Sequence, residues 1–501
     1  MAGATPNQAG RSKRALTLDD VTLVETSSLK RTISATALGN AMEWFDFGVY
    51  AYLATVIGKV FFPGGDATVQ LLASFGAFAA AFLVRPIGGM ILGPLGDKLG
   101  RQKVLAFTMI MMSASTFCIG LIPGYNTIGM WAPILLLVLR LIQGFSTGGE
   151  FGGAMTYLGE HAPDRIRGFL SSWLEFGTLF GYVLAALLAA LLTSALSDES
   201  LYSWGWRVPF FVAGPLGIIG LYMRLKLEET PAFEQHQQEQ DTNEESAARE
   251  LVTMVSGHWR PLLLCIGLVI AYMVATYMVL SYMPTYLSSV LDHSPETGNY
   301  LLIAVMIVMM VVQPFAGMAS DKWGRRPIIS LGCIGFLVLT IPSFWLLHTH
   351  SMVLVFIGLL LQGLCLNCFM GVMPSTLPAL FSTSIRYGAV AIGLNFSTSL
   401  FGGTTPLVST GLIDLFGSDM LPAYYMMIVA VIGLAVILLT AESSRKPLLG
   451  SKPAAADREE AREVLADHHN DIEEQVREID QQMAELQKNR DDLVAQHPRL
   501  S

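Results

Sequence analysis

The sequence has little charge and little cysteine for its length. Only 14% of its 501 residues are Asp, Glu, Lys or Arg, and 52% are hydrophobic, whereas a soluble protein carries roughly a quarter charged residues. All five cysteines stand in apolar segments, which excludes a disulfide framework. Cys365 and Cys368 form a CxxC pair without further ligand residues, so we expect no metal site and no cofactor. No nucleophile–base constellation appears either, which argues against an enzyme.

Long apolar blocks are what the sequence has in abundance. Each block is about 20 residues long, the length of helix that crosses the hydrocarbon core of a bilayer. The fold class predicted is an all-α integral membrane protein with twelve transmembrane helices, in two pseudo-symmetric six-helix bundles. The twelve blocks lie near residues 35–58, 69–92, 103–122, 131–158, 167–192, 207–226, 261–290, 300–319, 328–347, 352–380, 387–413 and 421–441.

Polar segments divide the blocks into predicted domains. The net charge of −9 arises from acidic residues that gather between Glu228 and Glu250 and after Glu442, and neither stretch suggests a nucleic-acid partner. The predicted domains are an N-terminal segment at 1–34, a first six-helix bundle at 35–226, a central loop at 227–260, a second six-helix bundle at 261–441 and a tail at 442–501.

Lysine and arginine gather in alternate short loops. Such loops stay in the cytoplasm during membrane insertion, so both termini and the central loop are predicted to be cytoplasmic. Lys59 and Arg207 are the exceptions, because they fall at the opposite ends of their spans. The residues that set the orientation are Lys98, Arg101, Lys103, Arg165, Arg167, Lys322, Arg325, Arg326 and Arg386.

One loop motif occurs twice at equivalent places. The chain reads GPLGDKLGRQKV from Gly93 and GMASDKWGRRPI from Gly317. An internal duplication of six helices is typical of secondary transporters, whose site lies between the halves. We expect Asp97 to hold Arg101 and to cap a neighbouring helix, which makes a latch that breaks as the halves move. A charged loop that only sets topology is the alternative. The predicted gating residues are Gly93, Asp97, Gly100, Arg101, Gly317, Asp321, Gly324 and Arg325.

The paired G-x-x-x-D-x-x-G-R loops resemble the loop motif of the major facilitator superfamily. Further segments resemble its metabolite–proton symporter branch, and with the helical tail they resemble the osmoprotectant symporters within it. These segments are GNAMEWFDFGVY, RPIGG, QGFSTGGEFGGA, RGFLSSWLEFG and WGWRVPFF.

That resemblance implies a function. It implies uptake of zwitterionic osmoprotectants such as proline and glycine betaine across a bacterial inner membrane, coupled to protons, by alternating access and activated by high osmolality. Two alternatives remain open from the residues: a proton symporter of a dicarboxylate or other metabolite, and a membrane osmosensor that signals through its tail. The predicted partners are the zwitterionic solute, protons and the lipid bilayer.

Ionisable residues inside the predicted spans are confined to the first half. A charged side chain at the centre of a bilayer is costly and marks function by default. Glu43 and Asp46 are spaced to share one helical face with Tyr50. We lean to Asp46 as the proton carrier coupled to Glu43, with Glu175 as a rival and a fixed salt-bridged cluster as the structural alternative. The predicted proton-coupling residues are Asp46, Glu43, Glu175, Arg85, Arg140 and Glu150.

A solute with a methylated cation and a carboxylate calls for aromatic faces and for cationic or amide donors. Aromatic residues in three spans and polar residues in others meet that requirement. The predicted substrate-binding residues are Trp44, Phe47, Tyr50, Gln143, Trp173, Tyr272, Tyr277, Tyr282, Asn367 and Asn395.

The tail carries a heptad pattern from about 462 to 497. Apolar residues that recur every seven positions predict a coiled coil, and a homodimer through it, with Arg490 opposite an acidic residue in an antiparallel pair, is our hypothesis. A single solvated helix is the alternative. The resemblance implies that the tail tunes the osmotic response. The seam residues are Leu465, Ile472, Val476, Ile479, Met483, Leu486, Arg490 and Leu493.

Overall fold

The structure is a computed structural model that describes residues 18, 21–24, 26–99, 101–225, 257, 259–383, 385–466, 477, 483, 484, 486 and 487. By their contacts the residues form two compact units. The larger comprises Ser27–Ser451, and the smaller comprises Met1–Thr26 together with Lys452–Ser501.

The larger unit is helical wherever an apolar block was predicted. Short helices α5 (Tyr125–Ile128) and α9 (Asp198–Ser203) and 3-10 turns η3 (Asp164–Ile166) and η4 (Gly205–Arg207) join the helices of its first half. The first six blocks correspond to α1 (Thr26–Tyr52) with α2 (Ala54–Phe61), α3 (Ala67–Leu99), α4 (Arg101–Leu121), α6 (Trp131–Ser146) with η2 (Thr147–Gly149) and α7 (Glu150–His161), α8 (Arg167–Ala195) and α10 (Val208–Leu225).

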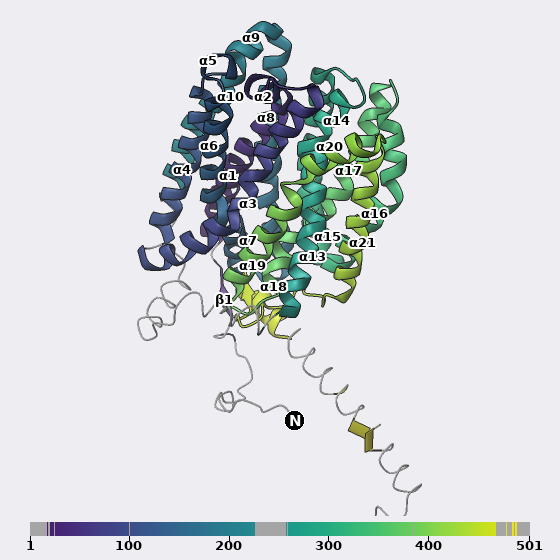
Figure 1. Ribbon diagram of the computed structural model, residues 1–501. Coiled ribbons are helices and arrows are strands. Elements are labelled where there is room, and N and C mark those ends of the chain that lie inside the picture. The colour runs from purple at the N-terminus through teal and green to yellow at the C-terminus, as the bar shows by residue number, and fades with distance from the viewer. Residues whose placement is uncertain are drawn as a thin grey trace, which may run out of the picture. The chain divides into compact units, whose positions relative to one another are not determined.

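The second half repeats this helical arrangement, and Figure 1 shows its helices standing beside those of the first half. The last six blocks correspond to α13 (Trp259–Thr276) with η5 (Tyr277–Tyr282) and α14 (Met283–Ser289), α15 (Pro295–Trp323), α16 (Arg325–Leu347), α17 (Met352–Met370) with α18 (Met373–Ala379), α19 (Arg386–Ser397) with η6 (Thr398–Gly402) and α20 (Thr405–Phe416), and α21 (Leu421–Leu439).

The helices have the length and composition of membrane spans. Among the described residues, eight helices or joined runs of helix are long and apolar enough to cross a membrane, and Ala106–Leu121 is a shorter apolar helix. Large apolar side chains such as Ile218, Val338 and Leu439 are more than 60% exposed on the helical unit. Such surfaces match hydrocarbon rather than water.

Two segments of the second half, η5 and η6, are π-helical. A π segment inserts an extra residue into a helical turn and is often found at functional sites. Both segments contact the first half: Ser281 bonds Tyr182 at 2.9 Å, and Ser399 Oγ donates to the carbonyl of Phe82 at 2.6 Å. The irregular turns of the second half therefore lie at the contact between the halves.

The smaller unit contains a short sheet that the sequence did not predict. β1 (Thr22–Leu23) pairs in parallel with β2 (Ala454–Ala455). Val21, Ala455 and Ala461 form a small apolar cluster, and Leu465 packs against it. The first seam residue of the predicted coiled coil is thus engaged with the N-terminal segment.

The remaining seam residues divide into two groups. Met483 and Leu486 are helical and exposed, at 59% and 67%. The other five, Ile472, Val476, Ile479, Arg490 and Leu493, lie outside the described residues.

Candidate functional site

The two carboxylates of α1 share a helical face but have different partners. Arg85 Nη2 of α3 lies 2.5 Å from Glu43 Oε1, and both side chains are less than 5% exposed. Asp46 Oδ2 accepts a hydrogen bond of 2.8 Å from the hydroxyl of Thr116 in α4, and Asp46 forms no ion pair among the described residues. One acid is therefore matched by a cation, whereas the other is held by a neutral group.

Arg140 of α6 is linked to Asp46 through two neutral side chains. Its Nη1 donates to Gln143 Oε1 at 2.5 Å, and Gln143 Nε2 donates to Thr116 Oγ1 at 2.8 Å. The guanidinium carbon lies 3.6 Å from the centroid of the Tyr50 ring, within cation–π range. Within the described structure, Arg140 Nε and Nη2 have no hydrogen-bond partner, although the side chain is fully buried.

Buried aromatic rings surround Trp44 beside these charges. Its ring lies 5.5 Å from Tyr182, 5.9 Å from Tyr277 and 6.1 Å from Phe47. Phe82 packs between Phe47 and Tyr277, with ring centroids at 4.8 and 5.2 Å. We call these five rings the aromatic cluster. It draws on both halves of the molecule, because Tyr277 belongs to η5.

The sequence reasoning missed several members of this site. Tyr182, Phe82 and Thr116 were not predicted, although all are fully buried. Phe82 lies three residues before Arg85, and Tyr182 lies seven after Glu175, so a search for aromatics one or two turns from each buried charge would have found both.

Glu175 of α8, like Asp46, is a buried carboxylate of the first half that forms no ion pair among the described residues. It is fully buried, and neither of its oxygens has a hydrogen-bond partner there. Its polar neighbours include Thr178 and Tyr272. Glu150 is held differently, because Thr108 Oγ1 donates to its Oε1 at 2.8 Å.

The other predicted substrate residues occupy varied places. Tyr272 and Tyr282 are buried with hydroxyl groups that lack a hydrogen-bond partner among the described residues. Trp173 is half-buried and has its ring contacts with Phe169 and Phe176 of its own helix. Asn367 and Asn395 are committed to backbone carbonyls, those of Met309 and Gly148. The structure thus does not bring Trp173 or these amides to the aromatic cluster.

The second copy of the loop motif joins the two halves. Asp321 at the end of α15 accepts hydrogen bonds from the backbone N–H groups of Gly168 and Phe169, at 2.7 and 2.8 Å, and so caps α8 of the other half. A Cβ on Gly168 would lie 2.8 Å from the carbonyl of Gly317. Glycine is therefore required where these helices approach.

The arginine of the motif's second copy has a different partner from the one predicted for Arg101, its equivalent. Arg325 Nη1 donates to the carbonyl of Ser375 and to Ser443 Oγ, not to Asp321. Gly324, with φ of 101°, links α15 to α16, and its backbone N–H bonds Ser320. In the first copy, Gly100 lies outside the described residues, and the side chains of Asp97 and Arg101 are not described.

Residues 442–451, which we call the strap, run along the end of the bundle where α15 ends and α16 begins. Glu442 accepts from the backbone N–H groups of Arg325 and Arg326, both at 3.0 Å, and of Ser443 and Ser444, both at 2.9 Å. Burial raises the pKa of Glu442, but these donors outweigh it and hold the pKa below its ordinary value. The strap is therefore anchored on the N-terminus of α16.

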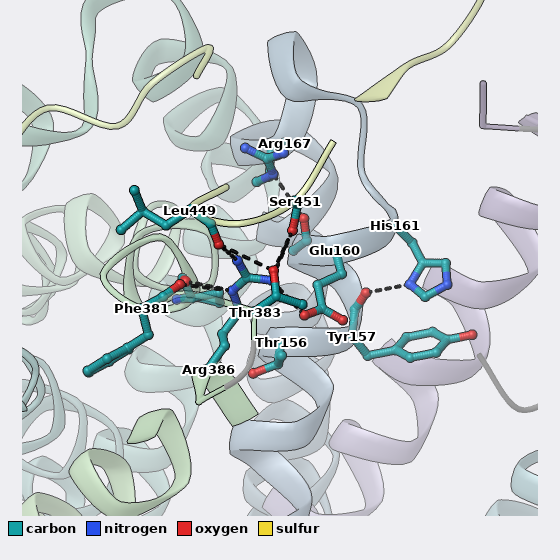
Figure 2. A network of polar contacts seen from close by, with 12 residues as sticks. Thr156, Tyr157, Glu160, His161, Arg167, Phe381, Thr383, Arg386, Leu449 and Ser451 are labelled. Carbon is teal, nitrogen blue, oxygen red and sulfur yellow. Dashed lines mark hydrogen bonds and ion pairs between the residues drawn. The ribbon is translucent and has the colours of Figure 1, made fainter. Parts of the chain in front are cut away.

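Two equivalent arginines hold the far part of the strap, and Figure 2 shows one of them, Arg386, beside Leu449 and Ser451. Arg167 Nε donates to the carbonyl eight residues before it, and Arg386 Nε does the same, at 2.9 and 3.0 Å. Arg167 Nη1 also donates to Lys446 O, and Arg386 Nη2 to Leu449 O. Arg386 Nη1 lies 2.7 Å from Glu160 Oε1, an ion pair between the halves. These contacts between the halves close the bundle at the end where α8 and α19 begin.

A cavity of about 670 Å³ lies between the halves, lined by α2, α3 and α9 on one side and by η5, α14 and α20 on the other. Polar and charged side chains, Lys59 and Asp414 among them, make up much of its lining. In Figure 1, α2, α9 and α14 stand at the opposite end from α18 and α19.

The sequence matches two known protein families. It matches the Major Facilitator Superfamily over residues 36–404 and 293–470, and the osmosensory transporter coiled coil over residues 456–501. The second match confirms the predicted coiled coil as a feature of the tail.

Curated relatives cover nearly the whole chain. A proline/betaine transporter of Salmonella typhimurium is 50% identical over 97% of this chain and 98% of its own. A glycine betaine/proline/ectoine/pipecolic acid transporter of Dickeya dadantii, OusA, is also 50% identical, with the same coverage. These relatives are named transporters, which confirms the prediction of a transporter rather than an enzyme.

Solved structures share the fold at low sequence identity. The xylose transporter XylE from E. coli, in a partially occluded inward-open conformation, superposes with a TM-score of 0.65 at 18% identity and covers 84% of this chain and 100% of its own. The likeness supports the predicted helical fold.

Proposed function

The chain belongs to the major facilitator superfamily, and on that premise we propose that it imports zwitterionic osmoprotectants such as proline and glycine betaine together with protons. The near-full-length relatives that bear these solutes in their names support the choice of substrate. The observation that carries it is the buried aromatic cluster one ring away from Arg140: Phe78 lies 5.0 Å from Phe82 of the cluster and 5.3 Å from the Arg140 guanidinium, whose Nε and Nη2 lack acceptors among the described residues.

The two ends of a betaine find different partners in this arrangement. Trp44 and Tyr277 offer ring faces, which attract a quaternary ammonium. In the part of the chain that the structure describes, Arg140 has N–H groups without acceptors, which suit a carboxylate. The solute would therefore lie across the first half, with its cation toward the cluster.

The same geometry argues against a dicarboxylate as the main substrate. Two carboxylates call for two available cations, but Arg85 is already matched by Glu43 at 2.5 Å. Arg140 has no ion-pair partner among the described residues and leaves two N–H groups, at Nε and Nη2, without acceptors there, whereas the charge of Arg85 is compensated and only its Nε lacks an acceptor. One available cation fits a solute with a single carboxylate.

Proton coupling is assigned to Asp46, with Glu43 as its fixed neighbour. A carboxylate held by an arginine cannot take up a proton without leaving that cation uncompensated in a low-dielectric site. Asp46 bonds the neutral Thr116 and can change its protonation state without that cost. Glu175, which also lacks a cation, is the rival carrier.

In transport by alternating access, the closed end of the bundle is the end that must open to release the solute. With the basic loops in the cytoplasm, Asp321, Arg386 and the strap close the cytoplasmic end, while the cavity lies toward the outside. Import requires these bonds between the halves to break after the solute binds. The inner membrane and cytoplasmic termini are part of this proposal.

The tail tunes the response to osmolality in this account. The osmosensory coiled-coil match begins at residue 456, directly after the strap, so the tail is covalently continuous with the closed end. A homodimer through Leu486, Arg490 and the other seam residues belongs to the same proposal. An osmosensor without transport has no use for the buried Asp46 and Arg140, and for this reason we place it second.

Competition for uptake tests the substrate class. Cells that express the chain and lack other osmoprotectant carriers should take up labelled glycine betaine at high osmolality. Excess proline should suppress this uptake, and ketoglutarate or citrate should leave it unchanged. Suppression by the dicarboxylates but not by proline would overturn the assignment, and absence of any uptake would favour the osmosensor.

A further inference from the structure

Lys59 is a cation that the charge rule for membrane orientation does not explain. It lies on α2, at the end of the helices opposite the basic loops, where lysine and arginine are otherwise sparse. Its ammonium group donates to the hydroxyl of Tyr202 at 2.8 Å. An ammonium group has three N–H donors, so this contact leaves others available.

Lys59 is exposed to solvent and stands in the lining of a cavity between the halves. The cavity of about 670 Å³ has Lys59 and Tyr202 on the wall from the first half, and Asp414 and Asp419 on the wall from the second half. Small-molecule sites commonly have volumes of about 300–1,000 Å³. The cavity is therefore large enough for a small solute with its water.

The charges on the two walls have opposite signs. Lys59 is suited to a carboxylate, and Asp414 and Asp419 are suited to a cationic nitrogen. A zwitterion presents these two groups at its two ends, so it can satisfy both walls at once. A simple anion or cation would satisfy one wall and be repelled by the other.

Tyr282 supplies a second, independent feature of a site. Its side chain is 99% buried and lines the cavity, and its hydroxyl has no hydrogen-bond partner in the described part of the chain. Such an unpartnered buried hydroxyl is expensive unless a ligand or water meets it. Tyr282 also ends η5, the π segment that begins with Tyr277 of the aromatic cluster. One short segment thus reaches from the cavity to the cluster.

We propose that this cavity is an outer binding site for the zwitterionic solute, occupied before the solute reaches the aromatic cluster. Lys59 holds the carboxylate, Asp414 with Asp419 holds the cationic end, and Tyr282 donates its hydroxyl to the solute. This inference rests on the proposed function, because it takes the solute to be a zwitterion.

Kinetics of charge variants test the outer site. In proteoliposomes, Lys59→Gln and Asp414→Asn should each raise the KM for glycine betaine roughly threefold, the scale of a solvent-screened charge pair, with the maximal rate retained. Lys59→Arg is the matched control and should keep the wild-type KM. The exchange variant Lys59→Asp with Asp414→Lys should recover much of the loss, because the solute can bind in the reversed direction.

The outcomes separate this inference from the proposed function. An unchanged KM in Lys59→Gln and Asp414→Asn, or a lower maximal rate at unchanged KM, would overturn the outer site while uptake by the wild-type protein leaves the function standing. Absence of zwitterion uptake by the wild-type protein would overturn both. Membrane abundance of each variant, measured alongside, shows whether a rate loss reflects the amount of protein.

Discussion

Glu43 and Asp46 lie three residues apart and have different chemistry because of what faces them. The spacing of the sequence was sufficient to place both on one helical face. The partner of each, Arg85 for Glu43 and Thr116 for Asp46, depends on how α3 and α4 pack against α1. Distant residues such as Thr116 carry no pattern that links them to α1, so sequence spacing alone could not assign the pairs.

Replacement of Asp46 should separate coupling from binding. Asp46→Asn removes the ionisable group and retains a polar side chain beside Thr116. We expect accumulation driven by a pH gradient to fall to the level reached without a gradient, whereas exchange of internal for external solute continues. Uptake and counterflow in proteoliposomes measure the two activities. Full accumulation in Asp46→Asn, together with its loss in Glu175→Gln, would move the proton to Glu175.

Disruption of the Glu43–Arg85 pair should mainly lower the stability of the folded protein. Glu43→Gln leaves the Arg85 charge buried without its counter-ion, and removing one partner of a buried pair costs about 3–5 kcal/mol. A lower midpoint of thermal unfolding in detergent is the expected result. The double variant Glu43→Gln with Arg85→Gln should recover part of the loss. An unchanged midpoint in the single variant would show that the pair contributes little.

At the scale of whole elements, the two halves are joined through contacts at the ends of their helices. The sequence located the repeated loops and predicted that Asp97 caps a neighbouring helix, and Asp321, its equivalent in the second copy, caps one. It did not identify α8 of the other half as that helix, nor the strap, because residues 442–451 follow the last span without any periodicity or motif. Their role is visible only through bonds to Arg167, Arg325 and Arg386.

Loss of the Asp321 cap should favour opening at the end of the bundle that the strap closes. Asp321→Asn keeps one acceptor oxygen and loses both the charge and the second acceptor, and a lost cap costs about 0.5–2 kcal/mol. The ratio of open to closed molecules should rise severalfold, up to about tenfold for 1.4 kcal/mol. Pulsed EPR distances between spin labels on α4 and α16 report that ratio. Asp321→Glu is the matched control, and identical distance distributions in Asp321→Asn and wild type would contradict the latch.

The strap should respond to acid through Glu442. Its pKa is lowered in the folded state, so the carboxylate stabilises the strap above the ordinary carboxyl pKa of about 4.3, and this contribution is lost as pH falls through the lowered value. Hydrogen exchange of residues 442–451 should be steady between pH 5 and 8, after correction for the intrinsic rate, and should accelerate below about pH 4. Glu442→Gln should exchange faster at neutral pH and lose the acid response; a response retained in Glu442→Gln would assign it to another group.

The whole molecule combines a transporter fold with a regulatory tail. The twelve apolar blocks and the duplicated loop predicted the helical fold, because both can be recognised in short stretches of the sequence. The parallel pairing of Thr22–Leu23 with Ala454–Ala455 was not predicted, since two-residue strands leave no alternation to detect. Packing of Leu465 against that cluster likewise depends on chain segments far apart in sequence.

A change at Arg490 tests how the tail acts on the whole molecule. Arg490 interrupts the apolar seam, and a charged residue at such a position sets register at a cost in stability. Arg490→Ile in the full-length protein should raise the melting temperature of the tail helix and alter which engineered cysteines cross-link. The osmolality at which uptake is half-maximal should shift. An unchanged cross-linking pattern and threshold would contradict a role in orientation.

The central claim is proton-coupled uptake of a zwitterion, and one measurement tests it most directly. Purified protein in proteoliposomes is given labelled glycine betaine at high osmolality, with and without an inwardly directed proton gradient. The account predicts accumulation above the external concentration only with the gradient, at a level that Asp46→Asn fails to reach. Equal accumulation with and without the gradient, or none in either case, would contradict it.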